Sequence, residues 1–507
     1  MRLPLVPVRT VSRLVLITVI STEAGCIAGR QTGGGLPDDP PALTAIVESD
    51  LRRDLFALAS TEMRGREGGT VDELRASAWL AERAREAGLE PAGDDGTYFQ
   101  FWRMRRSRVS DASSVSLGGA AIRMPDDGVF VTPVSASVDL PVVYVGEGRA
   151  ADLANIDLRG KAVAALLTAP ENSPPVGPLL TARRYTMLAV RQRAAFLSER
   201  GAAAVLIVSD SIGETQFQNI ATGWARGSYA LDTATSVVTR PTRVPVLWLR
   251  RASLARVRGA TAARFVASVT TDDFVVPSVN VVARVRGTDP VRREEHILYS
   301  AHQDGLGVRY AWDGDSTWKG ADDNATTSVA LLAIGRAFRA APARRSVLFV
   351  WHGSEELGLL GSRWFALHPT VPRASLAAVI NGDMIGRNHP DTAALMGVMS
   401  PNRNSRVLAD MALSANARVS RFAIDTSWDA PTHPEGLFQR SDHWPYALQR
   451  IPVIYFSTAL SADYHTPRDE ASRIDYAKLT RMSQWMYATG WAAANADQRP
   501  TLDGGRR

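Results

Sequence analysis

The sequence has almost no cysteine: Cys26 is the single one among its 507 residues. One cysteine excludes an intrachain disulfide, and it excludes a zinc site built from several thiolates. A chain of this length exceeds what one ordinary hydrophobic core supports. We therefore expect two or more folding units.

Lysine is scarce as well, since only Lys161, Lys319 and Lys478 are present. The formal net charge of +6 and the isoelectric point near 9.6 therefore come from arginines. These arginines are scattered among acidic residues, whereas nucleic-acid-binding surfaces gather their basic residues into a patch or stripe. We expect no nucleic-acid partner.

Long apolar runs are missing after the N-terminal region, so no later segment is predicted to cross a membrane. Near the N-terminus, three arginines precede a short apolar run and a stretch of small residues: Arg2, Arg9 and Arg13, then residues 14–20, then 21–26. This pattern is typical of an export signal, and the apolar run is too short to span a bilayer. We predict a signal over residues 1–26.

The end of this signal, Ala24-Gly25-Cys26, resembles a bacterial lipoprotein signal, whose cysteine is lipidated. Glu23 departs from that pattern, because an aliphatic residue is usual there. The expected location is outside the cytoplasm: the bacterial periplasm, an outer-membrane anchor or the medium. Any membrane attachment would run through a lipid on Cys26.

The rest of the chain divides by composition and periodicity. A linker rich in Gly, Pro and Asp over 27–44 precedes two helical patterns, near 46–58 and 71–87, and a strand at 98–104. Four short apolar strands and one helix, at 187–199, follow between residues 141 and 249. After Val276, apolar strands alternate with helices, which predicts a mostly parallel sheet covered on both faces.

The middle region also carries two short segments, Leu158-Arg-Gly-Lys161 and 201–207, each placed before or on a strand. They resemble a protease-associated (PA) domain. We therefore expect an α/β fold, a mostly parallel mixed sheet flanked by helices, with an inserted β-rich PA-like domain. The expected parts are 45–135 and 271–496 for the main domain, 136–270 for the insert and 497–507 for a polar tail.

The ends of the predicted strands carry an unusual number of titratable groups. In open α/β sheets, ligands bind just beyond the carboxyl ends of the strands. The groups found there, or in the loop that opens a helix, are His302, Asp304, Asp323, Glu355, Glu356, Asp383, His465 and Asp469. Each has an ordinary explanation taken singly, such as a helix N-cap or a surface ion pair. Together, so many acids at one edge repel one another unless a cation neutralises them.

This constellation predicts a metal site. Five of these groups, two imidazoles and three carboxylates without sulfur, form a set that suits zinc, and also manganese or cobalt. Five side chains exceed the three protein ligands of one catalytic zinc. Two ions that share a bridging carboxylate fit the set better.

At this point a specific resemblance appears. The segments that carry it are His302-x-Asp304, Gly320-Ala-Asp-Asp-Asn324, Glu355-Glu356-Leu-Gly-Leu-Leu-Gly-Ser362, Asn381-x-Asp383-Met-Ile-Gly386 and Tyr464-His465-Thr-Pro-x-Asp469. In order and spacing they resemble the co-catalytic zinc aminopeptidases of the M28 peptidase family over about residues 275–490. Residues 58–69 resemble the N-terminal part of bacterial members that carry a PA insert. The resemblance implies an exported enzyme that removes N-terminal residues from peptides with a free N-terminus.

The resemblance also implies roles for individual residues. His302 and Asp383 would bind one of two Zn²⁺ ions, Glu356 and His465 the other, and Asp323 would bridge them through a turn with a cis Asp323–Asn324 peptide bond. Glu355 would be the general base that activates a metal-bridging water, and Tyr464 would stabilise the oxyanion. Asp304 would orient His302, and Asp469 would do the same for His465. His352 and His443 are expected to be non-ligands.

Alternatives remain open at this stage. A related zinc carboxypeptidase on the same scaffold would need a basic pocket for the substrate carboxylate. A non-catalytic receptor-like relative would keep the fold without the activity, and an enzyme that cyclises N-terminal glutamine would use a similar scaffold. The sequence indicates neither the preferred residue nor an oligomeric state.

Overall fold

The structure is a computed structural model that describes residues 40–233, 244–259 and 263–504. These residues all belong to one compact unit, Pro37–Arg507. The predicted export signal with Cys26, and most of the predicted linker, lie outside the described residues. No helix in the described ranges has the length and apolar character of a membrane span.

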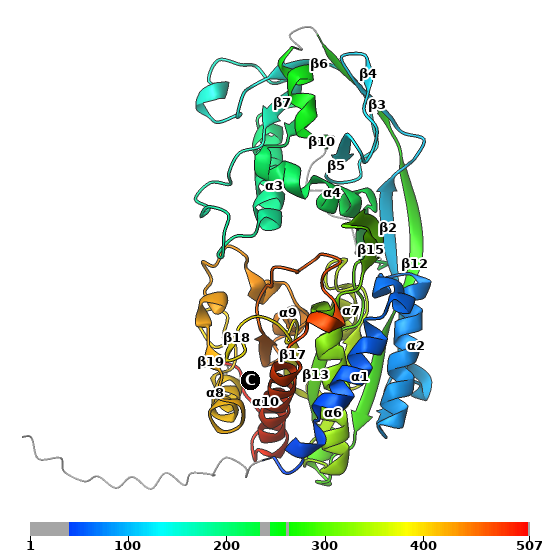
Figure 1. Cartoon of the computed structure of the whole chain (residues 1–507), viewed down its shortest axis with the longest axis vertical. Helices are drawn as coiled ribbons and strands as arrows, with labels where there is room; N and C mark the ends of the chain where they lie inside the picture. Colours follow the sequence, from blue (N-terminus) through cyan, green and yellow to red (C-terminus); the bar gives the residue numbers. More distant parts are fainter. Residues whose placement is uncertain (1–39, 234–243, 260–262, 505–507) are drawn as a thin grey trace, which may run out of the picture. The chain divides into compact units, whose positions relative to one another are not determined.

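The main sheet contains ten strands among the described residues (Figure 1). In spatial order they are β19 (Ala423–Ile424), β18 (Thr392–Met396), β20 (Val453–Ser457), β17 (Leu376–Gly382), β13 (His296–His302), β16 (Ser346–His352), β12 (Thr271–Val285), β2 (Phe99–Val109) and β9 (Ser228–Leu231), with β1 (Glu90–Pro91) beside β12. β20, β17, β13 and β16 run parallel, while β12, β2 and β9 extend the sheet in antiparallel pairs. The predicted mixed α/β class is confirmed.

The central strands are buried on both faces, which explains their near-continuous apolar sequences. In β13, Ile297 and Tyr299 belong to one core cluster, while Leu298 between them belongs to the cluster on the opposite face. Consecutive residues of a strand point to opposite faces, so each strand serves two cores. Because these four strands run in the same direction, their carboxyl ends lie at one common edge of the sheet.

Helices cover both faces of this sheet. On one face α10 (Tyr476–Asn495) packs against α1 (Glu48–Leu58), α6 (Thr326–Ala340) and α8 (Arg406–Ala415), and Figure 1 shows α1, α6 and α10 side by side. α2 (Val71–Glu86) packs on β12. On the other face α7 (Leu360–Leu367) packs against α9 (His443–Leu448). The hairpin of β14 (Gly307–Trp312) and β15 (Asp315–Trp318) lies between β13 and the turn that begins α6.

A second sheet of eight strands accounts for the middle of the chain. Its order is β4 (Ala120–Ala121), β3 (Ser114–Leu117), β11 (Arg264–Val269), β6 (Ala136–Tyr144), β7 (Ala162–Leu166), β8 (Ala204–Val208), β10 (Val246–Leu249) and β5 (Gly128–Phe130). The helices α3 (Ala182–Glu199) and α4 (Ser211–Ala225) pack against each other, and α5 (Leu254–Arg258) packs on β6. We call residues 114–269 the insert.

Two details of the insert differ from the sequence prediction. The second sheet already includes β3, β4 and β5, so it begins at Ser114 and not at 136, because these short strands pair with β11 and β10 much later in the chain. In addition, β9 lies inside the predicted insert range but pairs with β2 of the main sheet. That the insert is a PA domain stays a prediction.

Candidate metal centre

The edge where the parallel strands end gathers the titratable groups singled out in the sequence. His302 is the last residue of β13, Glu355 and Glu356 follow β16, and Asp383 follows β17. His465 lies in the loop after β20, and Asp323 lies in the turn before α6. All are buried or nearly so. The sheet topology therefore brings together groups separated by up to 163 positions, from His302 to His465.

The turn that carries Asp323 depends on glycine. Gly320 has a φ of 55°, and a Cβ at this position would overlap the carbonyl oxygen of Asp323. Only glycine adopts such a conformation without strain. The Asp323–Asn324 peptide bond is cis, as predicted. The Asn324 side chain donates to the carbonyl of Gly382 at 3.0 Å, which ties this turn to the end of β17.

The side chains form two groups whose ligand atoms lie within 4.8 Å of one another: His302, Glu355 and Asp383 in one, and Asp323, Glu356 and His465 in the other. In the first group, His302 Nε2 lies 3.5 Å from Asp383 Oδ1 and 3.9 Å from Glu355 Oε2. In the second, His465 Nε2 lies 3.2 Å from Glu356 Oε2. Such groups have the donor atoms and spacing of metal sites without sulfur.

Asp323 connects the two groups. Its Oδ1 lies 3.1 Å from His302 Nε2, and its Oδ2 lies 3.0 Å from His465 Nε2. One carboxylate thus faces an imidazole nitrogen of each group with a separate oxygen. A carboxylate in this position can bridge two cations.

The electrostatics of the site favour a cation. Burial alone would lower the pKa of His302, but Glu355 and Asp383 raise it well above its ordinary value. Burial raises the pKa of Glu355 well above its usual range, and the neighbouring Glu356 adds to this effect. Burial would also raise the pKa of Asp323, yet the two imidazoles beside it lower it below its usual value. Buried acids of this kind ionise readily only when positive charge lies next to them.

Several donor atoms have no other use in the fold. Among the described residues, His302 Nε2, Glu356 Oε1, Asp383 Oδ1 and His465 Nε2 are buried and have no partner with hydrogen-bond geometry, although the two imidazole nitrogens lie close to Asp323. Buried polar atoms are normally paired, so four orphans at one place require an explanation. Two divalent cations would satisfy all four atoms, and the donor set of nitrogen and oxygen suits zinc.

Asp304 and Asp469 hold backbone around the site. The carboxylate of Asp304 accepts the N–H groups of Glu355 at 2.9 Å and Glu356 at 3.2 Å. Its backbone carbonyl, and not its carboxylate, lies within hydrogen-bond distance of His302 Nδ1, at 3.1 Å. Asp304 therefore orients the Glu355–Glu356 pair as well as the imidazole.

Asp469 has a different position from the one expected. Its carboxylate accepts the N–H groups of Asp322 at 2.8 Å and Asp323 at 3.1 Å. His465 Nδ1 is buried without a hydrogen-bond partner among the described residues, so no such bond links it to Asp469. Asp469 fixes the turn of Asp323 instead.

Arg66 was not assigned a role from the sequence, although it lies within the family-like segment 58–69. Its side chain is completely buried and donates to four backbone carbonyls, those of Leu58, Gln303, Lys319 and Gly320, at 2.6–3.1 Å. Burial lowers the pKa of Arg66 to about 10, and nearby acids, Asp304 first, oppose this. Arg66 thus fastens the chain after β13 to the loop before Asp323, and it adds positive charge behind the acids.

Tyr464 lies at the rim of the site with its ring stacked on the imidazole of His465, the centroids 3.8 Å apart. Its hydroxyl accepts a hydrogen bond of 2.9 Å from Arg440 Nη2. Arg440 in turn donates to the carboxylate of Glu435 at 2.9 Å, and Glu435 accepts the backbone N–H of Thr181 at 2.8 Å. We call this chain of contacts, from the start of α3 to Tyr464, the Glu435 relay. The two charged residues of this relay, Glu435 and Arg440, are distant from Tyr464 in the sequence and belong to no recognised motif. The sequence alone therefore did not indicate them.

The two other histidines noted in the sequence belong to neither group. His352 Nε2 lies 3.1 Å from the hydroxyl of Tyr446, and the ring of His443 stacks on Tyr455 at a centroid distance of 4.6 Å. Burial lowers the pKa of each histidine to about 3. Both are neutral side chains packed against aromatic rings.

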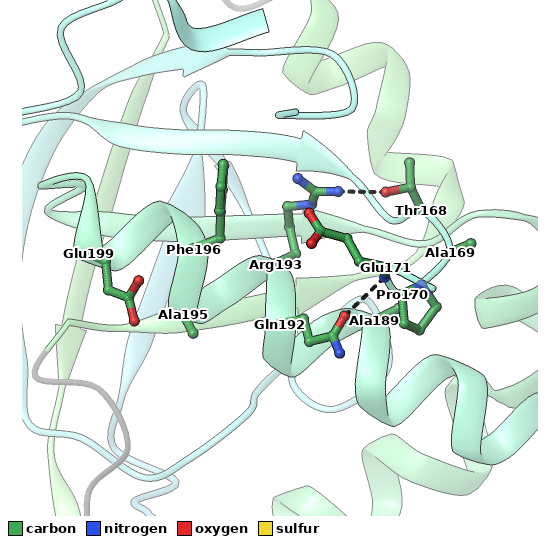
Figure 2. A pocket seen from close by; sticks show the side chains of 10 residues that line it. All are labelled: Thr168, Ala169, Pro170, Glu171, Ala189, Gln192, Arg193, Ala195, Phe196 and Glu199. Atoms are coloured by element: carbon green, nitrogen blue, oxygen red, sulfur yellow. Dashed lines mark hydrogen bonds between the residues drawn. The ribbon is translucent and has the colours of Figure 1, made fainter. Parts of the chain in front are cut away.

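A cavity elsewhere in the described residues lacks this chemistry. Figure 2 shows one of about 260 Å³ within the insert, lined in part by Thr168, Glu171 and Arg193. Arg193 there donates to Thr168 Oγ1 at 2.7 Å, and the N–H of Glu171 donates to Gln192 at 3.3 Å. No imidazole lines this cavity. The catalytic candidates are therefore those at the edge of the main sheet.

Comparison with known proteins agrees with this location. The model of peptidase family M28 matches residues 280–490. Aminopeptidase YwaD of Bacillus subtilis (strain 168) is 24% identical over 206 residues, which cover 39% of this chain and 43% of that protein. Leucine aminopeptidase 1 of Trichophyton rubrum is 24% identical over 239 residues, 45% of this chain and 61% of that protein. The chain thus spans about half the length of these curated relatives.

Solved structures share the fold over most of the chain. The aminopeptidase from Aneurinibacillus sp. strain AM-1 has a TM-score of 0.59 at 18% identity and covers 90% of this chain and 96% of its own. BSAP, a zinc aminopeptidase from Bacillus subtilis, has a TM-score of 0.60 at 17% identity, with 89% and 96% covered. At this identity the likeness concerns the fold, insert region included.

Proposed function

Because residues 280–490 form a domain of peptidase family M28, we propose that the protein is a di-zinc metallopeptidase that hydrolyses N-terminal residues from peptides. The observation that carries the proposal is the position of Asp323, whose two oxygens face the imidazoles of His302 and His465 at 3.1 and 3.0 Å. The names of the similar proteins, which are aminopeptidases, support the choice of reaction.

In this proposal, His302 and Asp383 would hold one zinc ion, Glu356 and His465 would hold the second, and Asp323 would be a ligand shared by both. When bound, the zinc ions supply Lewis acidity and lower the pKa of water. The four orphaned donor atoms and the absence of sulfur support this ligand set.

The remaining side chains divide the proton transfers and the charge. Glu355 takes the proton of the attacking water and passes it to the leaving amine. Its raised pKa suits a group that must hold a proton between these two events. The Tyr464 hydroxyl donates to the oxyanion that forms on the substrate carbonyl, since Arg440 already occupies an acceptor position on its oxygen. The free substrate amine binds near the acidic groups.

The test is a metal and substrate assay on the purified full chain. We expect two zinc ions per chain by mass spectrometry, cleavage of aminoacyl anilides and of peptides with a free N-terminus, loss of cleavage with a chelator and recovery with zinc. Peptides blocked at either terminus separate the alternatives. Cleavage of N-blocked peptides alone would indicate a carboxypeptidase, cyclised N-terminal glutamine would indicate a cyclase, and a zinc-loaded protein without activity would indicate a receptor-like relative.

Export is part of the same proposal and depends on the N-terminal sequence. We expect that cells export the full chain and remove its signal, and lipid on Cys26 would distinguish an anchored form from a periplasmic or secreted one. Incorporation of labelled palmitate into the wild-type chain but not into Cys26→Ser is the measurement. A labelled Cys26→Ser variant, or an unprocessed chain in the cytoplasm, would contradict it.

A further inference from the structure

A cavity of about 330 Å³ begins at the metal centre and is bordered by the insert. Glu356 and Leu306 line it, and the same two residues line the small cavity that contains Asp323 and His465. The insert contributes residues of α3 and α4 and the start of β9 to the wall, among them Arg183, Trp224 and Arg226. The volume lies in the range of small-molecule sites. A substrate on the metals would therefore extend into this cavity.

Three arginines line this cavity, and we call it the arginine pocket: Arg183, Arg226 and Arg309. Arg226 is neutralised, because its Nη1 lies 2.7 Å from Glu67 Oε1 and its guanidinium donates to the carbonyls of Leu306 at 3.0 Å and Val308 at 2.6 Å. Glu67 thus accounts for one of the three positive charges.

The other two arginines are not paired in this way, although the charges of Glu356 and Glu67 act on Arg309. Arg309 donates through Nε to the Leu306 carbonyl at 2.9 Å and lies over the Trp318 ring, 5.5 Å from its centroid. Arg183 has a buried Nε without a hydrogen-bond partner among the described residues. Neither makes an ion pair within the part of the chain that the structure describes. The positive charge of Arg183 acts on both Arg309 and Tyr464, so Arg183 lies near both.

Three buried or largely buried arginines elsewhere in the described residues have partners. Arg345 pairs with Glu295 at 2.6 Å, Arg440 pairs with Glu435 at 2.9 Å, and Arg66 donates to four carbonyls. Partly buried guanidinium groups of like charge repel each other and lose hydration, which is costly without an anion. An arginine also presents a fork of donors that matches a carboxylate.

We propose that the arginine pocket binds a carboxylate of the substrate while the metal centre acts on the peptide bond. The proposal rests on the proposed function, since it assigns the pocket to the same substrate. Two sources of the carboxylate fit the chemistry: the side chain of an acidic N-terminal residue, or the free C-terminus of a short peptide. The cavity adjoins Glu356, so either group lies within a few bonds of the scissile carbonyl.

The experiment compares pairs of substrates that differ only in the carboxylate. Glutamyl and glutaminyl anilides lack a peptide C-terminus and test the side chain. Leu-Gly-Gly and its C-terminal amide test the terminus. The zinc-loaded full chain is assayed as wild type, Arg183→Gln and Arg309→Gln. Arg159→Gln is the matched control, because Arg159 lies in the insert on an exposed ion pair with Asp157, outside the pocket.

A charge-assisted hydrogen bond is worth about 1.5–3 kcal/mol, which corresponds to about 10- to 150-fold in kcat/KM. We expect Arg183→Gln and Arg309→Gln to lower kcat/KM by that factor for the carboxylate member of one pair. The neutral member, which also reports that the variant is folded, should change less than about threefold. The pair that responds identifies the source. The proposal is overturned if neither pair distinguishes the variants from the control, or if both members fall equally.

A second readout does not require turnover. Calorimetry measures how tightly the zinc-loaded chain binds glutamate α-amide, glutamine α-amide, Leu-Gly-Gly and the C-terminal amide of Leu-Gly-Gly. These affinities separate the proposal for the arginine pocket from the proposed function. A preference for the carboxylate member that disappears in both pocket variants supports the pocket even if no substrate is cleaved, in which case only the proposed function fails. Equal binding of both members by the wild type overturns the pocket even if the enzyme is active.

Discussion

Replacing Glu355 with glutamine tests whether this residue is the proposed general base or a metal ligand. Glutamine has nearly the volume of glutamate, so the variant keeps the packing and the hydrogen bond from the backbone N–H of residue 355 to Asp304 Oδ1, which measures 2.9 Å. It removes the ability to accept a proton. The distinction matters because Glu355 lies in a group of potential metal ligands with His302 and Asp383.

Among the acidic residues around His302, Glu355 lies farthest from the imidazole. Its Oε2 is 3.9 Å from His302 Nε2, whereas the oxygens of Asp323 and Asp383 lie 3.1 and 3.5 Å from the same nitrogen. A general base contributes about 10²- to 10⁴-fold to a rate. That range corresponds to about 3–5 kcal/mol in the activation free energy. We expect Glu355→Gln to lose this factor in kcat with little change in KM.

The assay measures kcat on an aminoacyl anilide and zinc content on the same preparation. Glu355→Gln should retain two zinc ions, while the matched variant Glu356→Gln, which removes an oxygen 3.2 Å from His465 Nε2, should lose one. If Glu355→Gln lost zinc and Glu356→Gln kept it, the base and the ligand would be interchanged. Full activity of Glu355→Gln would refute the role of this carboxylate altogether.

Three further outcomes are expected from other positions. Asp323→Asn should lower zinc content below one ion per chain by mass spectrometry, because both imidazoles lose the same carboxylate; two retained ions would contradict bridging. Burial raises the pKa of Glu73 from its usual 4.5 to about 8, so its stabilising contribution is present below about pH 4.5 and is lost as the pH rises toward 8. The difference in free energy of unfolding between Glu73→Gln and wild type, measured by urea titration, should therefore be a few kcal/mol more favourable to the variant at pH 8.5 than at pH 5. An equal difference at both pH values would contradict this pKa. Arg66→Met should leave four carbonyls without their donor and lower the free energy of unfolding by at least about 3 kcal/mol in urea titrations, against which an unchanged midpoint would count.

The main sheet was predictable because its signals are local. Apolar runs such as 296–300 and 346–350 each begin after a charged residue, Glu295 and Arg345, and the observed β13 and β16 extend each run by two residues. The strand ends also indicated the site, since parallel strands place the residues after their carboxyl ends at one edge of the sheet. The ligand roles came from motif resemblance and stay predictions until metal is measured.

The rest of the structure depends on contacts that no local pattern encodes. α4 was not predicted, because Gly213 and Gly223 weaken its helical signal, and the helix is held by packing on α3. The early start of the insert depends on β3 pairing with β11 and on β5 pairing with β10, each across more than a hundred residues. The arginine pocket joins Arg183 and Arg309 from different parts of the chain, so only the fold brings their charges together.

The Glu435 relay has a consequence for engineering this protein. The carboxylate of Glu435 is almost fully enclosed and is shared between the first turn of α3 and the guanidinium that positions the Tyr464 hydroxyl. Excising residues 114–269 would expose that carboxylate to solvent and would allow the guanidinium of Arg440 to move. Under the proposed function, a truncated core would keep the proposed zinc ligands but lose the alignment of the Tyr464 hydroxyl, so the insert would support the site and could not be removed without effect.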